Sequence, residues 1–167
     1  MELEDERLVH MRQAFAVARR SFAAGGGPFG AVIVKQNQII ATGMSLARSL
    51  HDPTAHAEIL AIRSAAQALK RIDLSDCVAY SSAEPCPMCL SALYWSRIPA
   101  VYYGASWRDS TVFGYEDLYI YEELRKASDS RAMRSQPLLQ EEALAVIAAA
   151  AREHAYDSFL PCGWQPS

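Results

Sequence analysis

Two short stretches of the sequence carry residue types that bind transition metals. The stretch "HAE" contains His56, Ala57 and Glu58, and the stretch "PCPMC" places Cys86 three residues before Cys89. One imidazole and two thiolates are ligands that zinc takes, and three protein ligands leave a fourth position for water, as in catalytic zinc sites. The residue types therefore predict a catalytic Zn²⁺ site at His56, Cys86 and Cys89.

The spacing of the two cysteines supports a shared metal ion but leaves other uses open. Residues three apart lie on one face of a helix, so Cys86 and Cys89 can bind the same ion. A helix N-terminus also stabilises thiolates. A C-x-x-C pair serves equally well as a redox dithiol. A disulfide framework is not expected in a chain of 167 residues with four cysteines and no export signal.

Glu58 offers a carboxylate beside the expected metal. Zinc lowers the pKa of a bound water from about 15.7 to about 7, and a carboxylate that is not a ligand can pass the water proton to a ring nitrogen. We expect Glu58 to be this catalytic proton shuttle, although the helix dipole also favours an acid in a first turn. Because residues two apart do not share a helix face, His56 and Glu58 must splay around the helix tip.

The expected helices and strands place these residues at helix starts. Apolar spacing predicts helices over 4–24, 54–69 and 86–96, in "YEDLYIYEELRKA" and in "LLQEEALAVIAAAAREHAY". Strands are expected in "FGAVIVK", "QIIATGM", "CVAYSS" and "AVYYGAS", the first two as a hairpin across Gln36 and Asn37. The later alternation of strand and helix predicts a sheet with helices on both faces.

Length and composition favour one globular domain over residues 1–167. The chain is 51% hydrophobic and 21% charged, as is usual for globular proteins. A net charge of −3 with scattered Lys and Arg disfavours a nucleic-acid partner. The start, "MELEDERLVHMRQ", lacks the parts of a signal peptide, and no apolar run reaches the roughly 20 residues that span a bilayer. A cytoplasmic protein without a membrane segment is expected.

The motifs together resemble the cytidine deaminase superfamily and, within it, the bacterial guanine deaminases. H-x-E with P-C-x-x-C is typical of zinc nucleobase deaminases. The resemblance also covers "GGPFGAVIVK", "HDPTAHAEILAIR", "EPCPMCLSALYWSR" and "GYEDLYIYEEL". It implies an α/β protein with a three-layer α/β/α fold around a five-stranded mixed sheet, zinc at His56, Cys86 and Cys89, and Glu58 as the proton shuttle.

The same resemblance implies residues that hold the base. The matching positions are Phe29, the backbone around Ala57, Trp95 and Asp117. A carboxylate at Asp117 can accept from the adjacent N1–H and amine of guanine. Core packing for the two aromatic residues and a solvated helix position for the acid are the alternatives. Ser45 departs from the family, which usually carries an Asn there, and its hydroxyl has a shorter reach.

These observations predict zinc-dependent hydrolytic deamination of a free purine-like base, guanine to xanthine plus ammonia. Alternatives are another aminated heterocycle or nucleoside, adenosine in tRNA, and a catalytically silent deaminase fold that serves as a binding module. The acidic net charge disfavours tRNA. The resemblance further implies a homodimer that can exchange C-terminal segments, but the tail "AYDSFLPCGWQPS" gives no role for Tyr156 or Phe159.

Overall fold

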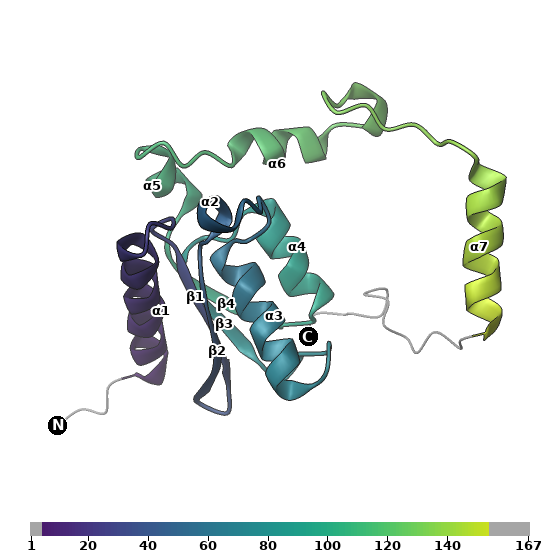
Figure 1. Cartoon of the computed structure of the whole chain (residues 1–167). Helices are drawn as coiled ribbons and strands as arrows, with labels where there is room; N and C mark the ends of the chain where they lie inside the picture. Colours follow the sequence, from purple (N-terminus) through teal and green to yellow (C-terminus); the bar gives the residue numbers. More distant parts are fainter. Residues whose placement is uncertain (1–4, 154–167) are drawn as a thin grey trace. The chain divides into compact units, whose positions relative to one another are not determined.

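The computed structural model describes residues 5–153, and Figure 1 shows the path of the backbone. One compact unit ends at Leu118 and a second begins at Tyr119. In chain order the helices and strands are α1 (Glu6–Ala23), β1 (Gly30–Lys35), β2 (Gln38–Met44), α2 (Ala47–Leu50), α3 (Ala57–Leu69), β3 (Val78–Ala83), α4 (Pro87–Trp95), β4 (Val101–Ala105), α5 (Trp107–Thr111), α6 (Leu118–Arg125), the 3₁₀ helix η1 (Ser128–Ser130) and α7 (Gln140–Glu153). The helices and strands predicted from the sequence are all present, and the short α2, α5 and η1 are additional.

The sheet is mixed and has the strand order β2-β1-β3-β4. β1 runs antiparallel to both β2 and β3, whereas β3 and β4 are parallel. The predicted hairpin turns at Gln36 and Asn37, whose φ angles of 47° and 64° suit a tight two-residue turn. Parallel neighbours need a crossover connection, and α4 supplies it between β3 and β4.

The number of strands differs from the expectation. The described residues contain four strands, not five. After β4 the described chain continues as α5, α6, η1 and α7. The segment "EALAVIAAAA" forms the helix α7 and not a strand, because it is rich in alanine, the strongest helix former. The residues before it are mostly polar. Within residues 5–153, β4 is therefore an edge strand of the sheet.

Helices cover both faces of the sheet, as predicted for a three-layer α/β/α fold. α1 packs on one face, where Val32 and Val34 of β1 join Tyr80 of β3 in a buried cluster. α3 and α4 pack on the other face, where Ala31 and Ile33 of β1 contribute to a second cluster. Successive residues of a strand point to opposite faces, so β1 is buried on both sides.

A close backbone approach holds the start of α3 against the sheet. A Cβ on Gly43 of β2 would collide with the carbonyl oxygen of Ala57 and lie 2.6 Å from the amide nitrogen of Ala61. Both alanines are fully buried. The glycine thus lets β2 fix the position of the helix start that carries His56 and Glu58.

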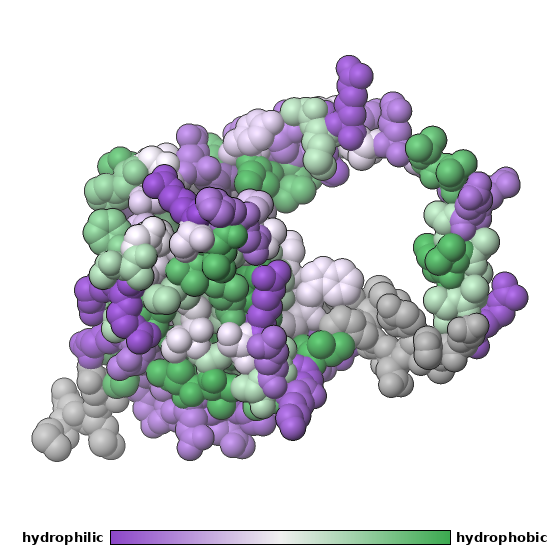
Figure 2. Space-filling model, in the orientation of Figure 1, coloured by the Kyte–Doolittle hydropathy of each residue, from purple (hydrophilic) through white to green (hydrophobic). Residues whose placement is uncertain are grey.

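The second unit contains most of α6, then η1 and α7. Within it, the Lys126 ammonium lies 2.5 Å from the Glu123 carboxylate. Figure 2 shows apolar side chains on α7, where Leu144, Val146 and Ile147 are 55%, 70% and 64% exposed.

Three expectations concern the chain as a whole. None of the described helices combines the length and the apolar character needed to cross a membrane. The tail with Tyr156 and Phe159 lies outside the described residues. A single domain over 1–167 stays a prediction.

The contact at Gly43 yields a prediction about both stability and metal binding. Gly43→Ala should lower the free energy of unfolding by about 1–3 kcal/mol, because the added methyl group overpacks the interface between β2 and α3. It should also weaken metal retention by displacing the start of α3. Denaturant unfolding and metal analysis check this, with Thr42→Ala, an exposed neighbour on β2, as the control. Unchanged unfolding and metal content in Gly43→Ala would refute the close approach.

Candidate active site

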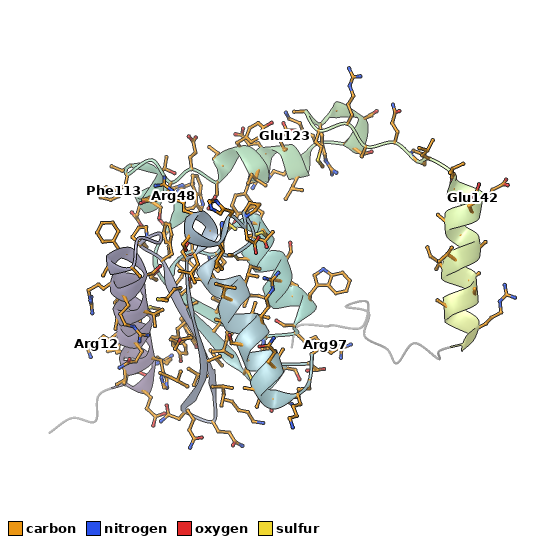
Figure 3. All side chains as sticks on the ribbon, in the orientation of Figure 1. Arg12, Arg48, Arg97, Phe113, Glu123 and Glu142 are labelled. Carbon is orange, nitrogen blue, oxygen red and sulfur yellow. The ribbon has the colours of Figure 1, made fainter. Side chains whose placement is uncertain are left out.

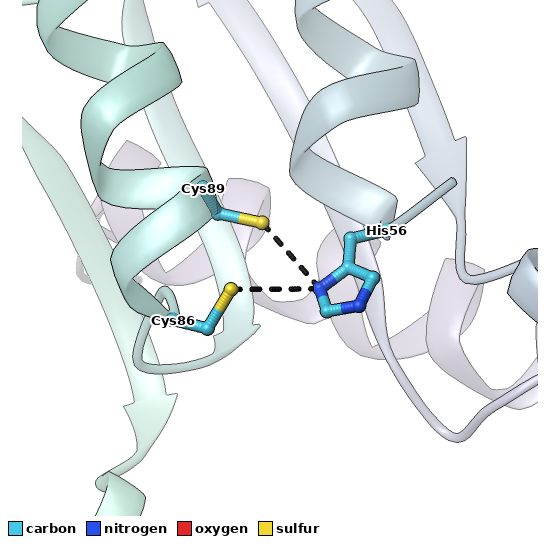
Figure 4. A group of neighbouring side chains, drawn as sticks. All are labelled: His56, Cys86 and Cys89. Carbon is cyan, nitrogen blue, oxygen red and sulfur yellow. Dashed lines mark hydrogen bonds between the residues drawn. The ribbon is translucent and has the colours of Figure 1, made fainter. Parts of the chain in front are cut away.

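The residues that start α3 and α4 face one another. His56 and Cys86 each precede the first helical residue in an extended conformation, and neither side chain caps its own helix. Nδ1 of His56 lies 3.6 Å from Sγ of Cys86 and 3.6 Å from Sγ of Cys89 (Figure 4). The fold thus brings together the three residues predicted to be metal ligands, which are 30 and 33 positions apart in sequence.

The geometry of these three residues fits zinc. One ligand atom from each lies within 4.8 Å of the others. Zinc takes S at about 2.3 Å and N at about 2.0–2.1 Å in a tetrahedral arrangement, which sets an N–S separation of about 3.6 Å. Both measured N–S distances agree with this value. Cys86 is 8% exposed and Cys89 is fully buried, so the sulfur atoms are shielded from competing reactions in solvent.

The three groups shift one another's pKa values through mutual hydrogen bonds. Hydrogen bonds from Cys89 and from His56 lower the pKa of Cys86 to about 4. The same interaction with Cys86, together with burial, raises the pKa of Cys89. The hydrogen bond to Cys86 raises the pKa of His56. The cluster therefore holds protons between its own donor atoms, and a metal ion that replaces them releases those protons.

Glu58 lies in the first turn of α3 and lines the same cavity as His56 and Cys86. Its side chain is only 7% exposed, and its Oε1 accepts a hydrogen bond of 2.7 Å from Ser81 Oγ on β3. It is not part of the group of converging ligand atoms among the described residues. The predicted splay of His56 and Glu58 around the helix tip is what the structure shows.

A cavity of about 310 Å³ opens beside these residues, which is within the range of small-molecule sites. Of the residues predicted to contact substrate, it is lined by Phe29, Ser45, Ala57 and Asp117. The Phe29 ring meets Tyr115 edge to face, with ring centroids 4.9 Å apart. This pair forms an aromatic wall that can contact a flat ring.

The charged groups that line the cavity are mostly acidic. They are His56, Glu58, Glu84, Glu116 and Asp117. Burial raises the pKa of Asp117, and the nearby Cys86 adds to this effect. These acids can accept hydrogen bonds from a ligand that carries donors.

Of the residues predicted to contact substrate, Trp95 alone does not line the cavity formed by the described residues. It ends α4, whereas Cys86 precedes the first residue of that helix. A rise of about 1.5 Å per residue over this helix places the two ends roughly 13 Å apart. Trp95 is 51% exposed and does not line the cavity. The tryptophan that lines the cavity is Trp107.

The sequence reasoning missed Trp107 and Glu84. Glu84 accepts a 3.0 Å hydrogen bond from the backbone N–H of Trp107 through Oε2, which ties α5 to the end of β3. Ser106 and Asp109 form a capping box at the start of α5. The sequence "SWRD" has the Ser-x-x-acid spacing of such a box, and this signal could have located the helix and its tryptophan.

The fold and the His–Cys–Cys group define a class of zinc-binding deaminases. The chain belongs to the cytidine and deoxycytidylate deaminase family, whose zinc-binding region matches residues 4–105. That match includes His56, Glu58, Cys86 and Cys89.

Within this family, the chain is similar to guanine deaminase. The Bacillus subtilis enzyme is 47% identical over 124 residues, which cover 74% of this chain and 80% of that protein. The X-ray structure of that enzyme superposes with a TM-score of 0.86 at 40% identity, covering 96% of this chain and all of the other. The tRNA-specific adenosine deaminase of Aquifex aeolicus is 43% identical, but over only 57% of this chain and 63% of that protein.

The cluster yields a prediction about metal content. The wild-type protein should contain about one zinc ion per chain, as expected for a three-ligand site. Cys86→Ala and Cys89→Ala should each lose this zinc. Cys77→Ala is the matched control, because Cys77 is also buried and free but lies outside the cluster. Elemental analysis of the purified proteins measures the result. Full zinc in both cluster variants, or its loss in the control alone, would remove the two cysteines from the metal site.

Proposed function

We propose that this protein deaminates guanine to xanthine and ammonia by zinc-dependent hydrolysis. One observation carries the proposal: the His56, Cys86 and Cys89 cluster borders the same cavity as the carboxylates of Glu58 and Asp117. The similarity to a guanine deaminase over 74% of the chain supports this substrate.

The proposed mechanism gives Glu58 the proton transfers. His56, Cys86 and Cys89 would hold a zinc ion, which would supply the Lewis acidity that makes a water molecule nucleophilic at neutral pH. Glu58 takes a proton from the water that attacks C2 of guanine and delivers it to N3. It then helps the amine leave as ammonia, so that one water is consumed and one ammonia is released.

The cavity walls orient the base in this proposal. Asp117 accepts hydrogen bonds from N1–H and from the amine of guanine, two adjacent donors that match the two oxygens of a carboxylate. Phe29 contacts the face of the ring, and the backbone at Ala57 forms the floor next to the metal. All three residues line the cavity, which supports these roles.

A second cavity favours one alternative, a larger aminated heterocycle or a nucleoside. It measures about 250 Å³ and shares Phe29, Ser45 and Tyr115 with the first cavity. Arg48 on α2 lines it and supplies a cation (Figure 3). Ser45 stands where the family resemblance implies a longer asparagine, and it lines both cavities. A substituent with hydrogen-bond acceptors would fit this extension.

We also propose a homodimer with exchange of C-terminal segments. Apolar residues exposed on α7 and the edge strand β4 with exposed Tyr102 and Tyr103 are surfaces that a second copy can cover. A mass in solution of one chain, 18.4 kDa, would rule the dimer out. The cytoplasmic location stays a prediction.

Ammonia release tests the reaction and its substrate. The zinc-loaded protein should release ammonia from guanine faster than from adenine, cytosine, their nucleosides, guanosine or aminated triazines. Glu58→Ala should keep its zinc and lose turnover by at least about 100-fold, the lower range for general acid–base catalysis. A higher rate on guanosine or a triazine would favour the alternative that the substrate is a nucleoside or a larger aminated heterocycle, which extends into the second cavity. Inertness across the panel with zinc bound would favour a silent binding module, and activity in Glu58→Ala would exclude Glu58 from the mechanism.

Asp117 can be tested separately from the metal. Asp117→Asn should lower kcat/KM for guanine by about 10- to 100-fold, because the amide replaces one acceptor with a donor that faces the donors of guanine, and charged hydrogen bonds contribute about 1.5–3 kcal/mol. Zinc content should not change. Glu116→Gln, an adjacent acid in the same lining, is the control. Equal losses in both variants would mean that cavity charge, not Asp117 itself, matters.

A further inference from the structure

Ser81 places a buried hydroxyl in an otherwise apolar row of the sheet. It lies on β3, which pairs with β1 on one side and β4 on the other, so its backbone is held from both sides. Its neighbours on the same face of the strand are Ala79 and Ala83, and all three are buried. A third alanine would continue this row, so packing alone does not call for a hydroxyl.

The Ser81 hydroxyl has a specific partner in Glu58. Oγ of Ser81 donates to Oε1 of Glu58 at 2.7 Å, and the two residues are 1% and 7% exposed. A buried carboxylate needs hydrogen-bond donors, and bonds to a charged acceptor are the stronger kind. One donor occupies one oxygen. Ser81 does not hold the second oxygen, Oε2, and the Glu58 carboxylate also interacts with the Cys89 thiol beside the cavity that Glu58 lines.

We propose that Ser81 is a positioning residue for the deamination reaction. By holding Oε1 from a central strand, it fixes the rotamer of Glu58, keeps the carboxylate out of the set of metal ligands and leaves Oε2 for the proton transfers. This inference rests on the proposed function, since its effect passes through Glu58. Nothing in the sequence motif alone identifies Ser81, because it lies 23 positions from Glu58 and outside both metal motifs.

Three variants test this role in the zinc-loaded protein. Ser81→Ala should lower kcat for guanine by about 10- to 100-fold, as loss of a group that orients a reactive side chain does. KM and zinc content should stay near the wild-type values. Ser81→Thr keeps the hydroxyl and should recover most of kcat. Ser96→Ala is the matched control, because it also removes one buried hydroxyl, at the end of α4 and outside the cavity lining.

A double-mutant cycle supplies a measurement that does not depend on activity. Ser81→Ala should change unfolding in denaturant when Glu58 is present and have a clearly smaller effect in the Glu58→Ala background, because the hydrogen bond is then already lost. In that background it should also lower residual turnover no further. Metal analysis of the same samples shows whether a rate change comes from loss of zinc.

Several outcomes would overturn the inference. These are an unchanged kcat in Ser81→Ala, an equal loss in Ser96→Ala, a loss that appears only in KM or zinc content, or equal effects on unfolding in both backgrounds. If Ser81→Thr fails to fold, the Ser81→Ala kinetics and the cycle still decide. If the wild type turns over another substrate of the panel and not guanine, the guanine proposal fails and kcat is measured with that substrate. Inertness toward every substrate contradicts both proposals.

Discussion

The structure depends on the convergence of two helix N-termini at one end of the sheet. α3 and α4 begin beside each other, and the residues just before their first turns, His56 and Cys86, point at a common centre. The positive ends of both helices stabilise the negative charge that two thiolates bring. Because β3 and β4 are parallel, the crossover helix α4 starts at the carboxyl end of β3, which is where open α/β sheets bind their ligands.

The same convergence places Glu58 and Asp117, two of the four carboxylates in the cavity lining, in different environments. Glu58 is enclosed between α3 and β3, hydrogen-bonded and nearly inaccessible, which suits a group that moves a proton next to the metal. Asp117 follows α5 in a less buried position, and burial and Cys86 raise its pKa. In the proposed function these two acids have different tasks, Glu58 in the reaction and Asp117 in recognition. The dication that neutralises the thiolates also offsets the repulsion among these acids.

The sequence predicted the elements that carry the metal residues because each has a strong local signal. The glycines and proline after α1, the two-residue hairpin turn and the apolar spacing of α3 and α4 all act over a few neighbouring residues. The sequence did not predict which tryptophan lines the cavity: Trp95 was expected there, and Trp107 lines it. A resemblance in sequence transfers a position, but whether Trp95 reaches the cavity depends on the length and direction of α4. Trp107 is held at the cavity by a long-range hydrogen bond between its backbone N–H and Glu84. The number of strands in the described sheet also depends on tertiary contacts, which local sequence patterns do not reveal.

We expect His56, Cys86 and Cys89 to hold a zinc ion with an open fourth position. X-ray absorption spectroscopy at the zinc edge of the purified protein tests this most directly, since sulfur and lighter ligands differ in distance. We expect two sulfur ligands at about 2.3 Å and two nitrogen or oxygen ligands at about 2.0–2.1 Å. A shell of four sulfur atoms, or one without sulfur, would contradict it.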